Sequence, residues 1–365
     1  MRKILLLTLD FPPSQGGVAR YLHGLAYYFQ KHLFVLASNG KDTQIFDQKA
    51  PYSIERKRLL YKIIWPHWLK SVLELLKRSK MYEIVFISHV LPLGTSAWIA
   101  SWITHKPYII FLHGFDLALA KQNSRKFWLL KKILSRAHFV VCNSNVLSSE
   151  VKQVFDISKT LTIYPPYLFT DQVEPEKKQA NQTDQIIFLT VSRLVKRKGH
   201  IRVLYALASL RDKGYKNFVY WIVGDGSMRR EIEEMIEELD LCYHVQIFSD
   251  ISDSKLHDFY AQADIFIMPT IYDPIDREGF GMVYIEAAAY GIPSIATKQP
   301  GVDEAVIHEQ TGILVEDGNQ SKLCEAIEVL SKNKVKREQF GKQARERVFK
   351  EFTTQKQFSK LEDYL

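Results

Sequence analysis

At 365 residues, the chain is too long for one ordinary hydrophobic core and fits two domains of about 170 to 180 residues each. With 46% apolar and 25% charged residues it has the composition of a soluble globular protein, and no apolar run approaches the roughly 18 residues that a membrane span needs. Its net charge of +8 is unevenly divided: residues 1–170 carry 23 Lys and Arg against 9 Asp and Glu, whereas residues 171–365 carry 26 against 32.

Short apolar segments alternate with helix-like patterns in the first half of the chain. A helix is clearest where Leu69, Val72, Leu73 and Leu76 share one helical face, after Pro66 in a plausible first turn. Segments rich in Ile, Val and Phe predict buried strands, and these are residues 4–9, 33–37, 84–88, 108–112, 139–143 and 161–164. The alternation is typical of a doubly wound parallel sheet.

A polar, proline-bearing stretch at residues 171–185 has the composition of an exposed linker, and we place the domain boundary there. The pattern then restarts, with strands predicted at 186–191, 219–223, 245–248, 265–268, 294–296 and 313–315. We therefore predict an α/β protein with two Rossmann-like domains, 1–170 and 186–345, that face each other across a cleft. Ligands of such sheets bind at the carboxyl ends of the strands.

The positive charge belongs to the first half alone, which carries +14 against −6 for the second half. The first domain should therefore face something anionic, either a membrane leaflet or a nucleic acid; a solvated basic surface is the alternative. The apolar run at 4–9 is too short for a signal peptide, so we expect a cytoplasmic protein. Cys142, Cys242 and Cys324 are far apart without metal-ligand spacing, and we interpret them as reduced core residues.

The segment from Glu278 to Glu286 indicates an anion site. Gly279 and Gly281 let the backbone approach a ligand, and the N–H groups of about residues 280–283 would face a phosphate at the start of a helix. Glu286 would lie one to two turns into that helix, about 6 to 8 Å from the anion, a reach suited to ribose hydroxyls. The alternative is an ordinary loop before a buried helix.

Further candidates follow the predicted strands of the first half. Gly16 and Gly17 leave backbone N–H groups free to face a phosphate or a sugar, although such a pair alone is more often a tight turn. His113 and Asp116 bring an imidazole and a carboxylate to the same sheet edge, and a structural role for the histidine is the alternative.

In the second half, Arg193 and Lys198 lie five residues apart across the turn that follows the first strand. They are near enough to converge on one diphosphate, whereas a surface charge run would not need a strand end. Gly224 and Asp225 end the next strand in a loop where the backbone can come close to a ligand.

Together these residues resemble the retaining glycosyltransferases of family 4, which have the GT-B fold, and the resemblance covers nearly the whole chain. The set is specific although no single member is. Residues 346–365 resemble the last helix of the family, which crosses back onto the first domain. The segments that carry the resemblance are Gly16-Gly17, His113-Gly114, Ser192-Arg193-Leu194, Lys198-Gly199, Gly224-Asp225-Gly226, Glu278 to Glu286, Gly291-Ile292-Pro293 and Gly312-Ile313-Leu314-Val315.

The resemblance implies a hexosyltransferase whose second domain binds a nucleotide-sugar donor and whose first domain binds the acceptor. Arg193 and Lys198 would neutralise the diphosphate, and Glu286 would hold the ribose. Glu278 would contact the donor sugar and phosphates, and His113 would line the sugar at the reacting face. The other implied positions are Gly16, Gly17, Gly224, Asp225, Phe280, Gly281 and Met282 toward the donor and Asp116 on the acceptor side.

The departing nucleotide diphosphate needs preorganised cations, and the loss of one such group typically costs about 3 to 4 kcal/mol. Because the chain contains no Asp-x-Asp, the resemblance implies that fixed Arg and Lys, rather than a metal ion, stabilise that charge, with no cofactor beyond the donor. Retention without a well-placed carboxylate nucleophile implies front-face attack, in which a donor phosphate oxygen accepts the proton of the acceptor hydroxyl.

Three departures from the family pattern concern the donor pocket. Residues 300–304, Pro-Gly-Val-Asp-Glu, stand where two glycines usually precede a glutamate, and Ser249 replaces a glycine near the base. Residues 272–276 lengthen the loop before Glu278 and could reshape the sugar pocket. Among donors, GDP-mannose is favoured over UDP-sugars.

The basic first half also bears on the acceptor. Aromatic and aliphatic residues at 63–68 suit a membrane interface, and neighbouring cations suit lipid head groups; a core helix with a solvated face is the alternative. We expect a lipid-linked or glycan acceptor at the inner face of an anionic membrane, as in phosphatidylinositol mannosyltransferases and polysaccharide-assembly enzymes, whose openings resemble Phe-Pro-Pro-x-x-Gly-Gly. The cations are Lys62, Lys70, Lys77, Arg78 and Lys80.

Other classes of protein compete with this interpretation. A nucleotide-sugar epimerase shares the architecture and the donor site but needs no acceptor. A nucleic-acid-binding protein would explain the basic half, but no groove-reading motif or basic-aromatic platform is visible, so we expect no nucleic-acid partner. A dinucleotide-dependent dehydrogenase would need a Gly-x-Gly-x-x-Gly after the first strand, which this chain lacks.

Overall fold

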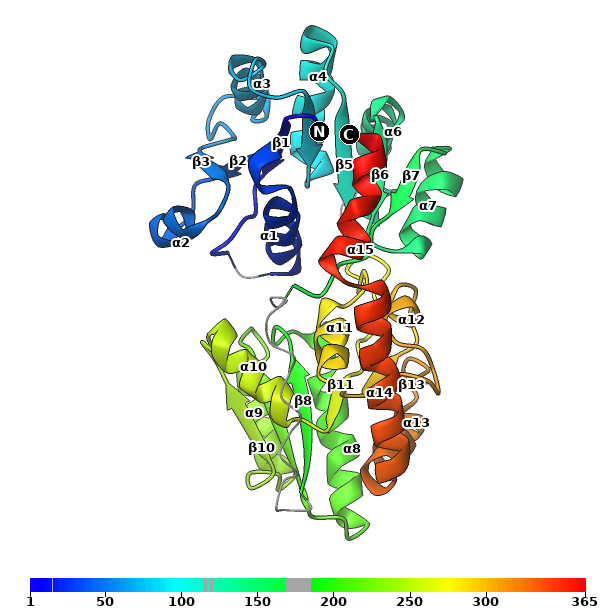
Figure 1. The fold of residues 1–365 in the computed structure, drawn as a ribbon. Helices are drawn as coiled ribbons and strands as arrows, with labels where there is room; N and C mark the ends of the chain where they lie inside the picture. The colour runs from blue at the N-terminus through cyan, green and yellow to red at the C-terminus, as the bar shows by residue number, and fades with distance from the viewer. Residues whose placement is uncertain (15, 115–116, 119–120, 169–184) are drawn as a thin grey trace. The chain divides into compact units, whose positions relative to one another are not determined.

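Each half of the chain builds its own parallel sheet (Figure 1). The computed structural model describes residues 1–14, 16–114, 117–118, 121–168 and 185–365, and the chain divides into two compact units. The second unit contains 185–273 and Phe280–Phe352 of the described residues. The first unit contains Met1–Leu168 and two later segments, Pro274–Gly279 and Thr353–Leu365, so the second half of the sequence contributes to both units.

The first sheet runs in the order β3-β2-β1-β4-β5-β6-β7. Leu5 and Leu7 of its first strand pack in one apolar cluster and Ile4 and Leu6 in another, so both faces of the sheet are covered, which explains the unbroken apolar runs. The strand order reverses between β1 and β4, whose carboxyl ends form the switch point where such sheets bind ligands. The strands are β1 Ile4–Thr8, β2 Leu33–Ser38, β3 Ser53–Lys57, β4 Ile84–Ile87, β5 Tyr108–Leu112, β6 Phe139–Cys142 and β7 Thr160–Thr162.

Helices cover this sheet, and the last segment of the chain joins them. Phe358 and Leu361 are fully buried in the apolar cluster that also holds Leu22 and Leu25 of the first helix. The helices are α1 Gly17–Phe29, α2 Thr43–Lys49, α3 Leu69–Lys77, α4 Thr95–Thr104, α6 Ser124–Arg136, α7 Asn145–Phe155 and α15 Thr354–Phe358, with short turns η1 Gln30–His32, η2 Val90–Gly94 and η4 Ser359–Tyr364.

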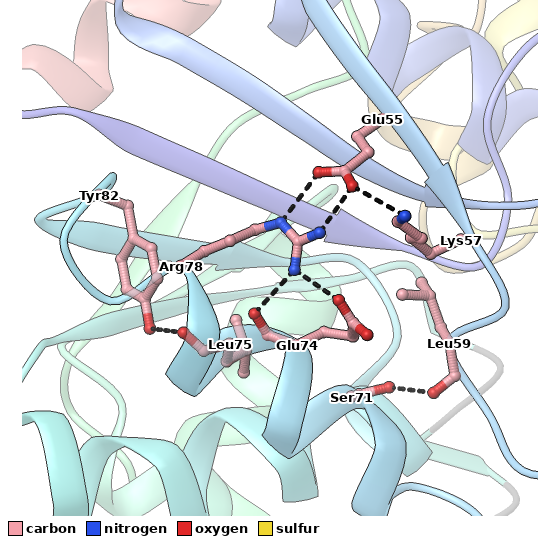
Figure 2. Close-up of polar contacts among 8 residues, drawn as sticks. All are labelled: Glu55, Lys57, Leu59, Ser71, Glu74, Leu75, Arg78 and Tyr82. Carbon is pink, nitrogen blue, oxygen red and sulfur yellow. Dashed lines mark hydrogen bonds and ion pairs between the residues drawn. The ribbon is translucent and has the colours of Figure 1, made fainter.

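A partly buried ion-pair network links helix α3 to strand β3 (Figure 2). Arg78, just after the helix, donates to both carboxylate oxygens of Glu55 on β3, at 2.9 and 2.7 Å, and also to the carboxylate of Glu74. Ser71 donates to the Leu59 carbonyl oxygen at 2.6 Å. The buried face of α3 is therefore partly polar, with Ser71 and Glu74 beside Val72 and Leu75.

The predicted helix is present as α3, but its apolar residues do not form one buried face. Val72 is buried as expected, but Leu69 and Leu73 are exposed, because the face that carries the ion pair is the one that packs. The helix begins at Leu69, so Pro66 precedes it instead of lying in its first turn. Because Arg78 is buried and paired with two carboxylates, it is not available for lipid head groups, which corrects that part of the prediction.

The second sheet runs in the order β10-β9-β8-β11-β12-β13, with the reversal between β8 and β11. Its switch point is therefore formed by the loops that follow those two strands. The strands are β8 Ile186–Val191, β9 Phe218–Val223, β10 Val245–Phe248, β11 Ile265–Met268, β12 Ser294–Thr297 and β13 Gly312–Val315. The helices are α8 His200–Asp212, α9 Arg229–Glu238, α10 Asp253–Gln262, α11 Met282–Ala289, α12 Val302–Ala305, α13 Gln320–Lys332 and α14 Lys334–Glu351, with the turn η3 Lys196–Lys198.

These sheets confirm the predicted α/β class with two Rossmann-like domains. The boundary near 170 stays a prediction, since residues 171–184 of the predicted linker lie outside the described residues. Cys142 is buried, but Cys242 is exposed and Cys324 only partly buried, so calling all three core residues was wrong. Within the described ranges, no helix has the length and apolarity to cross a membrane.

Candidate functional site

The turn after β8 places Lys198 at the switch point of the second sheet. Its side chain is 8% exposed, at the end of η3. Gly199 closes the turn at φ 77°, and a Cβ there would lie 2.2 Å from the carbonyl oxygen of Pro269, in the loop after β11. The glycine thus permits close packing of the two loops, and Lys198 is held where they meet.

Arg193 and Asp225 lie on loops that pack tightly against each other. A Cβ on Gly224 would lie 2.0 Å from the Ser192 carbonyl oxygen, so only glycine allows this approach. The Leu194 N–H donates to the Asp225 carbonyl oxygen at 2.9 Å. The side chains of Arg193 and Asp225 are exposed, so the structure brings the two residues together through their backbones.

Helix α11 begins and carries Glu286 as the sequence predicts. Gly281, in the left-handed region at φ 83°, precedes Met282, the first helical residue, and no side chain of the described residues caps this end. Phe280 is buried, so its backbone is the part that a ligand could meet. Glu286 is 5% exposed and accepts a hydrogen bond of 2.8 Å from the Tyr260 hydroxyl, which fixes one carboxylate oxygen.

Three buried polar side chains at or just after the ends of β11 and β12 were missed by the sequence analysis. The Oγ1 atoms of Thr270 and Thr297 and the Oε1 atom of Gln299 have no hydrogen-bond partner among the described residues. The Gln299 amide donates to the Thr270 carbonyl oxygen at 2.6 Å. Because buried polar groups are almost always paired, these atoms mark a place for a polar ligand or water. Their signal was a polar residue within three positions after the end of a predicted strand.

In the first unit, His113 follows β5 and packs edge-on against the Tyr21 ring, with 5.5 Å between centroids. Its Nε2 atom is buried and has no hydrogen-bond partner in the described parts of the chain. Burial, with a smaller contribution from His89, lowers its pKa to about 3. The imidazole is therefore neutral near pH 7, and Nε2 can donate or accept one hydrogen bond with a ligand, depending on the tautomer.

His89, which the sequence analysis did not select, lies at the switch point of the first sheet. Its Nδ1 is 2.7 Å from Ser88 Oγ, which donates to Thr8 Oγ1 at 2.8 Å, and that hydroxyl donates to the Asp10 carbonyl oxygen. Burial lowers the pKa of His89, and the Asp10 carboxylate partly opposes that shift. A Cβ on Gly16 would meet Asp10 Oδ2 at 3.9 Å, which places the predicted glycine pair beside this hydrogen-bonded chain.

Glu278 lies in the segment of the second half that belongs to the first unit. A Cβ on the next residue, Gly279, would lie 2.9 Å from the His113 carbonyl oxygen and 3.0 Å from Asn143 Nδ2. The backbone beside Glu278 therefore packs directly on His113. Asn143 is buried, its Oδ1 has no partner among the described residues, and no motif in the sequence pointed to it.

The predicted residues fall into one group in each unit, and their roles stay predictions. Asp116 lies outside the described residues. In the described ranges, no group of three or more His, Cys, Asp and Glu side chains is placed to hold a metal ion. The first unit holds Gly16, Gly17, His113 and Glu278; the second holds Arg193, Lys198, Gly224, Asp225, Phe280, Gly281, Met282 and Glu286.

Comparison with known sequences gives matches along nearly the whole chain. Residues 15–167 match the Glycosyltransferase Family 4 model and residues 171–347 the Glycosyl transferases group 1 model. One relative is the GDP-mannose-dependent alpha-(1-6)-phosphatidylinositol monomannoside mannosyltransferase of Mycolicibacterium smegmatis, 27% identical over 338 residues, which are 89% of this chain and 88% of the relative. Another is the capsular polysaccharide biosynthesis glycosyltransferase CapM of Staphylococcus aureus, 27% identical, with coverage of 90% and 88%.

Comparison with solved structures supports the same fold. The crystal structure of HepE from Anabaena in complex with UDP has a TM-score of 0.82 to this chain at 20% identity, and covers 99% of both chains. The paired parallel sheets are thus those of the GT-B fold. This chain belongs to the family 4 glycosyltransferases, enzymes that transfer a sugar from a nucleotide-sugar donor.

Proposed function

We propose that the protein is a retaining, metal-independent hexosyltransferase that moves mannose from GDP-mannose to a hydroxyl of a lipid-linked or glycan acceptor. The buried Lys198 carries the proposal. A cation held at the carboxyl ends of parallel strands, out of bulk water, is suited to the diphosphate of a donor and to the charge that develops as it leaves.

The second unit supplies the groups for the donor. Lys198 and Arg193 meet the diphosphate, and the N–H groups at Gly281 and Met282 add the positive end of a helix dipole. Glu286 accepts the ribose hydroxyls, and its bond to Tyr260 holds the carboxylate in one orientation before the donor binds. The donor is the substrate, and no further cofactor is needed for this chemistry.

The proposal also specifies the donor, with mannose as its sugar and guanine as its base. The relatives from Mycolicibacterium smegmatis and Corynebacterium glutamicum, each 27% identical to this chain, are named as GDP-mannose-dependent enzymes, and this is the support. Thermal-shift titrations with GDP, GDP-mannose, UDP and UDP-glucose test it directly, because at equal concentration the ligand that binds the folded state more tightly raises the melting temperature more. We expect the larger shifts from the guanine compounds, and the reverse order would reject GDP-mannose.

Retention and front-face attack form the mechanistic part of the proposal. The neutral His113 can hold a sugar hydroxyl without placing a charge at the reacting carbon, and Glu278 contacts the sugar from the adjoining segment. A donor phosphate oxygen takes the acceptor proton, while Arg193 and Lys198 stabilise the leaving group. Proton NMR of the product should show the anomeric configuration of the donor, and EDTA should leave the rate unchanged.

Membrane attachment is proposed for one surface of the first unit, the α3 strip, which we define as Ile63, Ile64, Trp65, Leu69 and Leu73. Ile63 is 94% and Trp65 82% exposed, far more than large apolar side chains usually are. Lys62, Lys77 and Lys80, which are near these residues in sequence, are exposed as well. Apolar side chains for the lipid boundary with cations for anionic head groups support a peripheral protein at the inner face of the membrane.

One incubation tests the activity as a whole. The protein is mixed with GDP-mannose and vesicles that contain phosphatidylinositol, and mannosylated lipid is followed by mass spectrometry. We expect mannosyl transfer to the lipid. A change in the sugar of the donor without any acceptor would instead identify an epimerase.

A further inference from the structure

Glu150, on helix α7, binds two cations from different parts of the chain. One carboxylate oxygen accepts a hydrogen bond from Lys121 and the other from Arg277, the residue before Glu278. The side chains of Glu150 and Arg277 are only 16% and 18% exposed, so this ion pair is better shielded from water than ordinary surface pairs. Burial alone would raise the pKa of Glu150, but the two hydrogen bonds lower it, and the carboxylate is ionised at neutral pH.

The residue after Glu278 contacts the same part of the first unit. Gly279 packs against Asn143, at the end of β6, and against the His113 carbonyl oxygen. Asn143 is joined to α7 through Ser144, whose hydroxyl caps that helix. The β6–α7 connection and its helix therefore contact the chain on both sides of Glu278.

We propose that the ion pair between Glu150 and Arg277, supported by Lys121, is a positioning device that holds Glu278 beside His113. The inference rests on the proposed function for the role of Glu278 in sugar transfer. A segment of three residues that is held at its first and last members leaves the middle residue little freedom. Because a displacement of about 1 Å can cost about a hundredfold in rate, such a device would act on turnover more than on binding.

Substitutions at the two paired residues test this role. In E150Q, which keeps the shape of the side chain but removes its charge, we expect kcat to fall about 10-fold to 100-fold while the donor KM changes less than about threefold. R277Q should behave alike, R277K should keep most of the activity, and the double variant E150Q/R277Q should be no slower than either single one. If the fold-losses in kcat of the two single variants multiply in the double variant, the two residues act independently and the proposal is overturned.

The second unit offers a matched control. Glu328 on α13 also accepts hydrogen bonds from two lysines, Lys213 and Lys332, at 2.8 Å each. E328Q therefore removes a carboxylate of the same kind, and we expect both kcat and KM to stay within twofold of the wild type. A loss in E328Q equal to that in E150Q would show a general charge effect and overturn the positioning role.

Limited proteolysis gives a readout that does not need activity. Trypsin cleaves after arginine, and Arg277 in its ion pair should resist cleavage in the wild type. In E150Q we expect a fragment that begins at Glu278, identified by mass spectrometry. If the wild type transfers no sugar, the proposed function fails, but this measurement still decides whether Glu150 holds the segment. Equal resistance of both proteins would overturn the inference.

Discussion

Lys198 and Lys196 belong to the same turn but differ in burial, and we expect them to differ in their effect on activity. Lys198 is buried at the switch point, whereas Lys196 is exposed. For Lys198→Ala we expect kcat to fall about 10²-fold to 10³-fold, about 3 to 4 kcal/mol, because the leaving diphosphate loses a preorganised cation. Lys196→Ala should stay within twofold. Steady-state kinetics on both variants check this, and near wild-type turnover in Lys198→Ala would reject its role.

Gly199 is required both for its positive φ and for the close approach of another backbone, and Gly214 has the first of these features without the second. Both Gly199 and Gly214 have positive φ, at 77° and 90°, but a Cβ at Gly214 would meet no atom within 4 Å. Gly214→Ala should therefore lose only about 1 kcal/mol of unfolding free energy through backbone strain. Gly199→Ala also places a methyl group against the Pro269 carbonyl, and we expect a further loss of about 1 to 3 kcal/mol. Urea unfolding measures both, and equal losses would contradict this packing.

His200 predicts how stability responds to acid. Burial, reinforced by the nearby Lys198 and partly opposed by a hydrogen bond to the Arg193 carbonyl, lowers its pKa from 6.5 to about 4. Between these two values the unfolded chain binds a proton that the folded chain does not, so stability falls as the pH falls through this range. One such group removes about 2 kcal/mol between pH 7 and pH 5.

His200→Gln removes this titration and keeps an amide that can reach Ser192, the partner of His200 at 3.1 Å. We expect the variant to lose less unfolding free energy than the wild type between pH 7 and pH 5, whatever its stability at pH 7. Urea unfolding of both proteins at both pH values gives the four unfolding free energies that this comparison needs. Parallel losses in the two proteins would show that His200 takes a proton in the folded state.

Among the elements, α3 and the residues before it make the sharpest prediction about the membrane. The wild type should sediment with anionic vesicles at low salt and less at physiological salt, since each lysine near the surface contributes about 1 kcal/mol that salt screens. Trp65→Glu should reduce partitioning at least about tenfold, because the exposed indole no longer enters the lipid boundary. Tyr243→Glu, at a residue 96% exposed in the second unit, is the matched control. If the wild type sediments with vesicles at neither salt concentration, the proposed membrane attachment is rejected.

The same helix shows what the sequence could not predict at this scale. The strands whose members are buried on both faces, such as Tyr108–Leu112 and Ile186–Val191, were predicted with their bounds, because burial selects unbroken apolar runs. The edge strand Ser53–Lys57 was missed, since its residues are mostly polar. The rotation of α3 depends on a pair between Arg78 and Glu55, 23 positions apart, which periodicity does not reveal.

At the scale of the whole molecule, the sequence predicted site residues where a short motif carries them. Lys198, Glu278 and Glu286 belong to local patterns and could be selected before the fold was known. His89 and Asn143 belong to no such motif: His89 is linked through Ser88 to Thr8 on another strand, and Asn143 meets Gly279 from far along the sequence. A rule that inspects each polar residue at or just after the predicted end of a buried strand would have found both.

The last segment of the chain supports a unit built mostly from the first 168 residues. Phe358 is fully buried there, edge-on to Tyr21 with 5.4 Å between ring centroids. Removal of a buried phenylalanine side chain costs about 3 to 5 kcal/mol. Phe358→Ala should therefore destabilise the first unit, whereas Phe349→Ala, on an exposed face of α14, should change stability by less than about 0.5 kcal/mol.

Tryptophan fluorescence can assign this loss to one unit. Trp221 lies in the second unit, whereas the other tryptophans, Trp65, Trp68, Trp98, Trp102 and Trp128, lie in the first. Fluorescence during urea unfolding therefore reports mainly the first unit, and Phe358→Ala should shift that transition to lower urea. An unchanged midpoint would mean that residues 353–365 add nothing to the first unit. A shift would show that a unit built mostly from residues 1–168 is complete only when residues 353–365 have joined it.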